Sequence, residues 1–369
     1  MLATCLLLAP PVVDADEAQH GPRYFFFERS FFWFAQLDKE VLAAPAYYGE
    51  AERERDDGSI LFEAQVDPQL LLVNQLKTLD LKFGTRPSPD TGEGAGPARR
   101  SWLPQVFGDR WVVSFAFKMR LRQLGGFSSP LHNPSFMPKF TLQRLSVTRK
   151  RAGDFLSDDS IGVNWIKVFG PEIVLWGHHS NGGSGCLSLE EQAPDCDSAV
   201  PPEQRTVNTQ NGSFSTDYVR LGYHFLKGRP DASGRWFRRS FSVGGWVELN
   251  PSHWGPGSIP PGQRAIYGPT RLGVITELQQ QFKLRGNHWN ASLNPSYEYI
   301  KFDHKPAPDS SPHRFIVDLS AVKDEGKLRG WGLALRFYQG QDFNNLLFIR
   351  DIRRVQFGLV VDQQTRRLD

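Results

Sequence analysis

A histidine and a serine two residues apart, His178 and Ser180, are the first residues in this chain whose types and spacing could do chemistry. They stand at the end of an alternating apolar run. Because side chains i and i+2 of a β-strand point to the same face, both are expected on the face that carries Val174 and Trp176. His179 is expected on the opposite face. A histidine beside a serine is the minimum that a base-activated hydroxyl nucleophile requires.

The residues that follow the serine agree with this hypothesis. Asn181-Gly182-Gly183 suits a tight turn. Backbone N–H groups in such a turn could stabilise the oxyanion that forms when a serine attacks an ester. A His-x-Ser pair in a strand is nevertheless more often structural than catalytic, so the elements that carry the pair matter.

Those elements are segments of period-2 alternation separated by joints rich in Gly, Pro and Asp, and no stretch has the pattern of a long amphipathic helix. The segments are Tyr24–Gln36, Ile60–Val73, Arg110–Arg122, Phe136–Arg149, Ile161–Ser180, Ser213–Lys227, Trp236–Leu249, Thr270–Phe282, Asn287–Phe302, His313–Val322, Leu328–Tyr338 and Ile349–Val361. They exceed the five or six residues that are typical of strands in soluble sheets. Long and short connections alternate between them. These features predict an all-β fold, an antiparallel transmembrane β-barrel of about 12 strands.

The two faces of these segments differ in polarity. In Trp111–Arg122 every odd position is apolar, and from Ser114 onward every even position is polar or small. An apolar face opposite a face with Arg and Lys fits a lipid-facing wall around a polar interior. It also fits a large soluble β-protein with one solvated face, so a secreted β-sandwich that binds a ligand stays an alternative.

The composition excludes other classes of protein. The 369 residues carry a net charge of +3, and no stripe of Lys and Arg indicates a nucleic-acid partner. No run of about 18 apolar residues predicts a membrane-spanning helix. The apolar start of the chain is typical of a remnant of an export signal. We therefore expect a signal-peptide remnant at 1–18, an N-terminal extension at 19–57 and the barrel at 58–369.

Two of the three cysteines, Cys186 and Cys196, fall in one polar loop that contains proline. In an exported protein this spacing indicates a disulfide that closes the loop. A metal site in the loop is a weaker interpretation, because the loop holds no histidine and no further cysteine.

The run from His178 to Gly182 resembles the His-x-Ser-Asn-Gly signature of the outer membrane phospholipase A family. Three other stretches resemble that family in the same order: Ser128–Pro138, Ser213–Leu221 and Tyr338–Leu359. The resemblance covers the chain in patches from about Ile60 to Val361.

The resemblance implies a twelve-stranded barrel in the outer membrane of a Gram-negative bacterium. Its catalytic residues would lie on the lipid-facing wall and hydrolyse the acyl esters of phospholipids. Ser180 would attack the ester carbonyl, and His178 would remove the serine proton. The same resemblance implies a requirement for calcium and activity as a homodimer.

The family places an asparagine third in its catalytic triad, and this chain departs from that pattern. Ser215 stands at the matching position, and strand parity puts it on the outward face, so Ser215 is the predicted third catalytic residue. Its hydroxyl can accept a hydrogen bond from the imidazole. Asn211 has the same parity and is the alternative. Because the family's residue is neutral, no buried carboxylate is expected.

Calcium ligands are carried over from the resemblance by position alone. Ser128 matches a serine ligand of the family, and Asn211 falls where another serine ligand lies. Both offer the oxygen atoms that Ca²⁺ prefers. If the loss of the family's asparagine has removed activity, the alternative function is a catalytically impaired barrel that acts in binding or transport.

Overall fold

The structure is a computed structural model that describes 13 strands and part of the connections between them. It describes residues 30–38, 60–67, 69–74, 106–124, 134–151, 163–181, 183, 185–190, 192, 196, 208, 212–230, 237–250, 264, 267–302, 311–325, 328–342 and 351–361. Within these residues, no helix has the length and the apolar character needed to cross a membrane.

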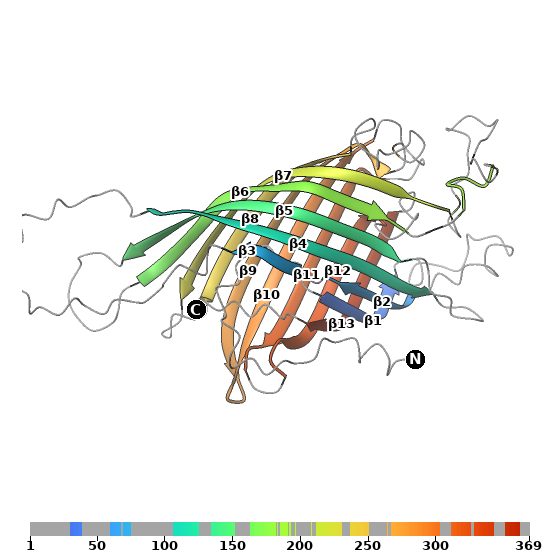
Figure 1. The fold of residues 1–369 in the computed structure, drawn as a ribbon. Coiled ribbons are helices and arrows are strands. Elements are labelled where there is room, and N and C mark those ends of the chain that lie inside the picture. The colour runs from blue at the N-terminus through green and yellow to red at the C-terminus, as the bar shows by residue number, and fades with distance from the viewer. Residues whose placement is uncertain are drawn as a thin grey trace, which may run out of the picture.

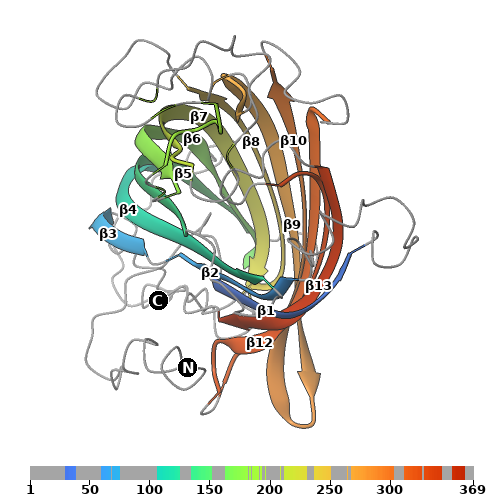
Figure 2. The same cartoon turned by 90° about the vertical axis from the view of Figure 1, so that its right-hand side faces the viewer.

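The described residues form a single antiparallel sheet of 13 strands that curls round on itself (Figures 1 and 2). The strands are β1 (Ser30–Asp38), β2 (Ile60–Val66), β3 (Gln69–Asn74), β4 (Val106–Leu124), β5 (Ser135–Arg151), β6 (Val163–Ser180), β7 (Ser215–Pro230), β8 (Phe237–Leu249), β9 (Thr270–Leu284), β10 (Asn287–Lys301), β11 (His313–Lys323), β12 (Trp331–Gln341) and β13 (Asp351–Val361). Every segment of period-2 alternation in the sequence overlaps one of these strands or, between residues 60 and 73, two. The predicted all-β antiparallel barrel is therefore confirmed.

The pairing of β2 brings the two ends of the sheet together. β2 pairs with β1 on one side and with β4 on the other, so the pairings lead from β13 through β1 and β2 to β4. β3 pairs with an earlier part of β4, so β2 and β3 follow one another along the same neighbour. If β2 and β3 are counted as one strand of the barrel, the number of strands is the predicted number of about twelve.

Strand β1 lies within residues 19–57, the range that the sequence assigned to an N-terminal extension. Its pairing with β13 and β2 makes this part of the range a strand of the barrel. The expected signal-peptide remnant at 1–18 lies outside the described residues.

The alternation in sequence becomes an alternation in exposure. In β7, Leu221 and Tyr223 are 57% and 53% exposed, whereas His224 and Leu226 are buried. Large exposed apolar side chains occur on most of the other strands too, among them Leu70, Trp111, Phe241, Leu272, Tyr297, Phe315, Leu333 and Phe357. The outer face of the barrel is therefore apolar over most of its circumference.

The inner face carries charged side chains that are held in ion pairs. Arg122 on β4 is 3% exposed, and its guanidinium contacts Glu63 at 3.0 Å and Asp342 at 2.7 Å. Arg336 contacts Asp318 at 2.6 Å. Buried charges are costly unless they are paired, so these contacts allow a polar interior.

Candidate functional site

The site begins at an irregularity in β6. Trp176 pairs with Phe140 of β5, but the next pairing is that of Val174 with Thr141, so Leu175 is an extra residue on β6. An extra residue of this kind is a β-bulge, and it reverses the inward and outward alternation beyond it. Leu175 and Trp176 are consequently both outward, at 49% and 43% exposed, whereas Val174 is fully buried. The prediction that His178 shares a face with Val174 is therefore wrong, and the prediction for Trp176 is confirmed.

His178 is held by a carboxylate that the sequence did not lead us to expect. Its Nδ1 lies 2.7 Å from Oδ1 of Asp217 on β7, directly opposite in the strand register. The two side chains are 25% and 16% exposed. Asp217 has the outward parity of Leu221, as Ser215 does. The expectation of a neutral partner for the imidazole is therefore corrected, because a carboxylate occupies that place.

The signal that would have found Asp217 was present in the sequence. Asp217 alternates with Val219, Leu221 and Tyr223, so it is an acidic residue on an otherwise apolar face. It is the third residue of β7, close to the end of the strand. The family resemblance predicted Ser215 instead, because a resemblance matches positions within a motif and does not show which residues pair between strands.

Ser180 is the last residue of β6 and pairs with Ser215 in the strand register. It is half-buried, and no hydrogen bond joins its hydroxyl to His178 or to any other side chain that the structure describes. The His178 imidazole is thus oriented by Asp217 without a contact to the Ser180 hydroxyl. Catalytic hydrogen bonds are often loose or unformed until substrate binds.

Asn181 holds the chain that leaves β6 against the chain that enters β7. Its side chain is completely buried. Its Oδ1 accepts hydrogen bonds from the backbone of Phe214 at 2.8 Å and of Gly183 at 3.1 Å, and its Nδ2 donates to the Gly212 carbonyl at 2.7 Å. The Asn181 backbone N–H donates to the Phe214 carbonyl at 3.2 Å.

These bonds change the predicted oxyanion site. The N–H groups of Asn181 and Gly183 both donate to acceptors within the protein, so neither is free for a substrate. Gly182, the remaining residue of the turn, lies outside the described residues. Asn181 therefore fixes the loop, and the oxyanion role predicted for the N–H groups of Asn181 and Gly183 is not supported.

The loop beyond Asn181 is cross-linked. Cys186 and Cys196 form a disulfide, as their spacing predicted. A parallel bridge joins Gly185 to Gly212, and the Asn208 side chain donates to the Cys186 carbonyl at 3.2 Å. The two strands that carry His178 and Asp217 are thus connected by a loop with internal cross-links.

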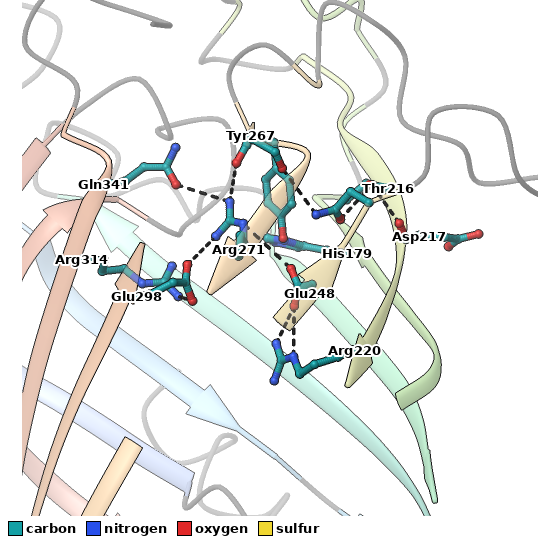
Figure 3. A network of polar contacts seen from close by, with 12 residues as sticks. His179, Thr216, Asp217, Arg220, Glu248, Tyr267, Arg271, Glu298, Arg314 and Gln341 are labelled. Atoms are coloured by element: carbon teal, nitrogen blue, oxygen red, sulfur yellow. Dashed lines mark hydrogen bonds and ion pairs between the residues drawn. The ribbon is translucent and has the colours of Figure 1, made fainter. Parts of the chain in front are cut away.

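The inner side of this region is a polar network (Figure 3). His179 is buried, as its predicted opposite orientation requires, and its Nδ1 lies 3.2 Å from the hydroxyl of Tyr267. Burial raises the pKa of Tyr267, so its hydroxyl stays protonated and can donate a hydrogen bond to the imidazole. Arg271 donates to the Tyr267 carbonyl at 2.6 Å and to Glu298 at 2.9 Å. These contacts support the strands of the site from within the barrel.

The predicted calcium ligands Ser128 and Asn211 lie outside the described residues. The alternative role of Asn211 as the partner of His178 therefore stays a prediction. Among the residues that the structure describes, no group of three or more His, Cys, Asp or Glu could hold a metal ion. The carboxylate closest to the site, Asp217, already contacts His178. The described residues therefore give no calcium site, and no step of the chemistry is assigned to a metal.

No protein-family model and no curated protein sequence matches this chain. Among solved structures, it is similar to outer membrane phospholipase A from Escherichia coli, with a TM-score of 0.41 and 14% identity over 94% of this chain and 95% of that one. An active-site mutant of the same protein gives a TM-score of 0.41 at 14% identity, over 93% and 92% of the two chains. The calcium-bound outer membrane phospholipase dimer of Salmonella typhi gives 0.37 at 14%, over 92% and 91%. The likeness is distant and concerns the fold alone, so the function of this chain has to be argued from its own geometry.

Proposed function

We propose that this protein is an esterase that hydrolyses acyl esters of phospholipids on the outer wall of its barrel. The observation that carries the proposal is the 2.7 Å contact between His178 Nδ1 and Asp217 Oδ1, two residues along the strand from Ser180, on an outward and apolar face. A serine, a histidine and a carboxylate in that relation are the elements of a base-activated nucleophile.

In this proposal each of the three side chains has its own role. An ionised carboxylate only accepts hydrogen bonds, so Asp217 favours the tautomer of His178 that carries its proton on Nδ1. Nε2 then holds the lone pair that a general base needs. The Ser180 hydroxyl is two residues further along the same face, and in the proposed mechanism it engages Nε2 when the substrate binds.

The reaction follows the general course of a serine esterase. His178 takes the proton of Ser180 as the serine oxygen bonds to the ester carbonyl carbon. The tetrahedral intermediate expels the glycerol oxygen of the lipid, which receives that proton, and an acyl ester of Ser180 remains. Water then attacks this ester with His178 again as base, and a fatty acid is released.

The position of the site favours a lipid substrate over a soluble one. Ser180 lies at the end of a wall of β6 and β7 whose outward face also carries Trp176 and Leu221, which are 43% and 57% exposed. A barrel whose outer wall is apolar and whose charges are paired inside is suited to a bilayer, and the export signal predicted from the sequence makes the outer membrane of a Gram-negative bacterium the proposed location. The ester of a neighbouring lipid then reaches Ser180 from the side.

Purified protein in detergent micelles tests this proposal. Release of fatty acid from a phospholipid should be abolished by Ser180→Ala and strongly reduced by His178→Ala. His313→Ala is a matched control, because His313 is an exposed histidine on β11, outside the site. Equal rates for wild type and Ser180→Ala would reject the mechanism. A wild type without activity would favour the alternative of an impaired barrel in binding or transport.

Calcium dependence and activity as a homodimer belong to the same proposal, and they rest on the sequence resemblance alone. A calcium chelator should lower hydrolysis, and added calcium should restore it. If the active form is a homodimer, the specific activity should fall when the protein is diluted. Activity that the chelator does not change would contradict the calcium requirement. Specific activity that dilution does not change would contradict the homodimer.

A further inference from the structure

Next to the bulge in β6, Gly177 lies in close contact with a side chain of β7. A Cβ atom added at Gly177 would lie 2.2 Å from Cζ of Tyr218, which is closer than two carbon atoms can approach. The Tyr218 ring is 6% exposed, and the guanidinium of Arg220 lies 5.5 Å from its centroid. The ring thus fills the space that a side chain at position 177 would need, and it packs against the inner side of the bulge.

On the outer side, the bulge places the indole of Trp176 beside the imidazole of His178. The two ring centroids are 6.1 Å apart, with an angle of 19° between the ring planes. Trp176 is 43% exposed, so its ring lies on the outer surface of the wall. The imidazole therefore has two neighbours: Asp217 at Nδ1 and the indole beside one ring face.

These two contacts restrain different motions. The hydrogen bond to Asp217 fixes the position of Nδ1, but it leaves the imidazole free to tilt about the line of that bond. Contact with a nearly parallel aromatic ring opposes the tilt, because the stacked arrangement is lost when the planes turn. Together they set the direction in which Nε2 points.

We propose that Trp176 is a positioning residue for the reaction, which holds the His178 imidazole in the plane that directs Nε2 toward Ser180. This inference rests on the proposed esterase function. Stacked aromatic pairs stabilise a structure by an amount equivalent to about 2- to 12-fold in an equilibrium or a rate. Removal of the indole should therefore lower kcat by a factor in this range and leave KM unchanged.

Two substitutions at Trp176 distinguish the effect of its aromatic ring from the effect of its apolar surface. Trp176→Phe keeps an aromatic face beside His178, whereas Trp176→Leu keeps an apolar side chain without a ring. Trp111→Leu makes the same change at another outward tryptophan, which is 39% exposed on β4. With a phospholipid substrate in micelles, we expect the loss of kcat in Trp176→Leu only, and Trp176→Phe should restore most of it.

A second measurement does not depend on activity. In protein with isotope-labelled histidine, the His178 imidazole resonance can be identified by its absence in His178→Gln, among the 9 histidines of the chain. The ring current of a stacked indole shifts that resonance. We expect the shift to disappear in Trp176→Leu, to persist in part in Trp176→Phe and to be unchanged in Trp111→Leu.

The two measurements together decide between the possible outcomes. An active wild type with the same kcat in Trp176→Leu would overturn the positioning role, as would a change confined to KM. An unshifted imidazole in wild type would show that the stack does not form. A shifted His178 resonance in a wild type without activity would confirm the stack but reject the esterase function. The positioning role of Trp176 in catalysis would then be rejected too.

Discussion

Replacement of Asp217 by alanine removes the group that orients the proposed base. Asp217 Oδ1 lies 2.7 Å from His178 Nδ1, and the side chains are 16% and 25% exposed, so water competes only in part for this hydrogen bond. A hydrogen bond to a charged group contributes about 1.5–3 kcal/mol. If that stabilisation is lost in the transition state, kcat falls by about 10- to 150-fold. KM should change little, because Asp217 does not contact the substrate in the proposed mechanism.

Two further variants make the test specific. Asp217→Asn should retain more activity than Asp217→Ala, because an amide oxygen can also accept the proton on Nδ1. Ser215→Ala tests the residue that the sequence predicted for this role. If Asp217 orients His178, the effect of Ser215→Ala should stay within about twofold, the size that is usual for a surface substitution.

The assay is the initial rate of fatty-acid release at saturating phospholipid, with purified variants in the same detergent. Thermal unfolding of each variant shows whether the barrel is intact, so that a loss of kcat is not a loss of folded protein. An Asp217→Ala variant as active as wild type would refute this reasoning. Equal losses for Asp217→Ala and Ser215→Ala would do so too.

Three substitutions should affect stability, measured as the free energy of unfolding in denaturant. Gly177→Ala drives a methyl group into the Tyr218 ring and should cost about 1–3 kcal/mol. Asn181→Ala leaves buried backbone groups near Phe214 without partners, at about 1–3 kcal/mol each, and should also lower kcat. Arg122→Met removes the nearest cation from two buried carboxylates, Glu63 and Asp342, and should cost about 3–5 kcal/mol. Unfolding midpoints equal to that of wild type would contradict these assignments.

The strands could be predicted from the sequence because their signal is local. A strand with one apolar and one polar face shows period-2 alternation whatever its neighbours are, so each segment from Ile60 to Val361 was found with small errors at its ends. The number of strands near twelve followed from the same count. The disulfide between Cys186 and Cys196 was likewise predictable, since both cysteines lie in one short loop.

The face of Val174 and the partner of His178 could not be predicted in the same way. The bulge at Leu175 is a feature of the pairing of β6 with its two neighbouring strands, and no local pattern in the sequence shows it. The pairing of His178 with Asp217 depends on the register between β6 and β7. Register is a property of two strands, and the intervening loop leaves it unspecified in sequence.

The central claim is that Ser180 is a nucleophile activated by His178, and covalent labelling tests it most directly. A sulfonyl fluoride reacts with an activated serine to form a sulfonate ester and release fluoride, and mass spectrometry of the digested protein locates the adduct. The account predicts an adduct on Ser180 in wild type, far slower labelling in His178→Ala, and an undiminished rate in His313→Ala. A wild type without an adduct on Ser180, or one that is labelled there no faster than His178→Ala, would contradict it.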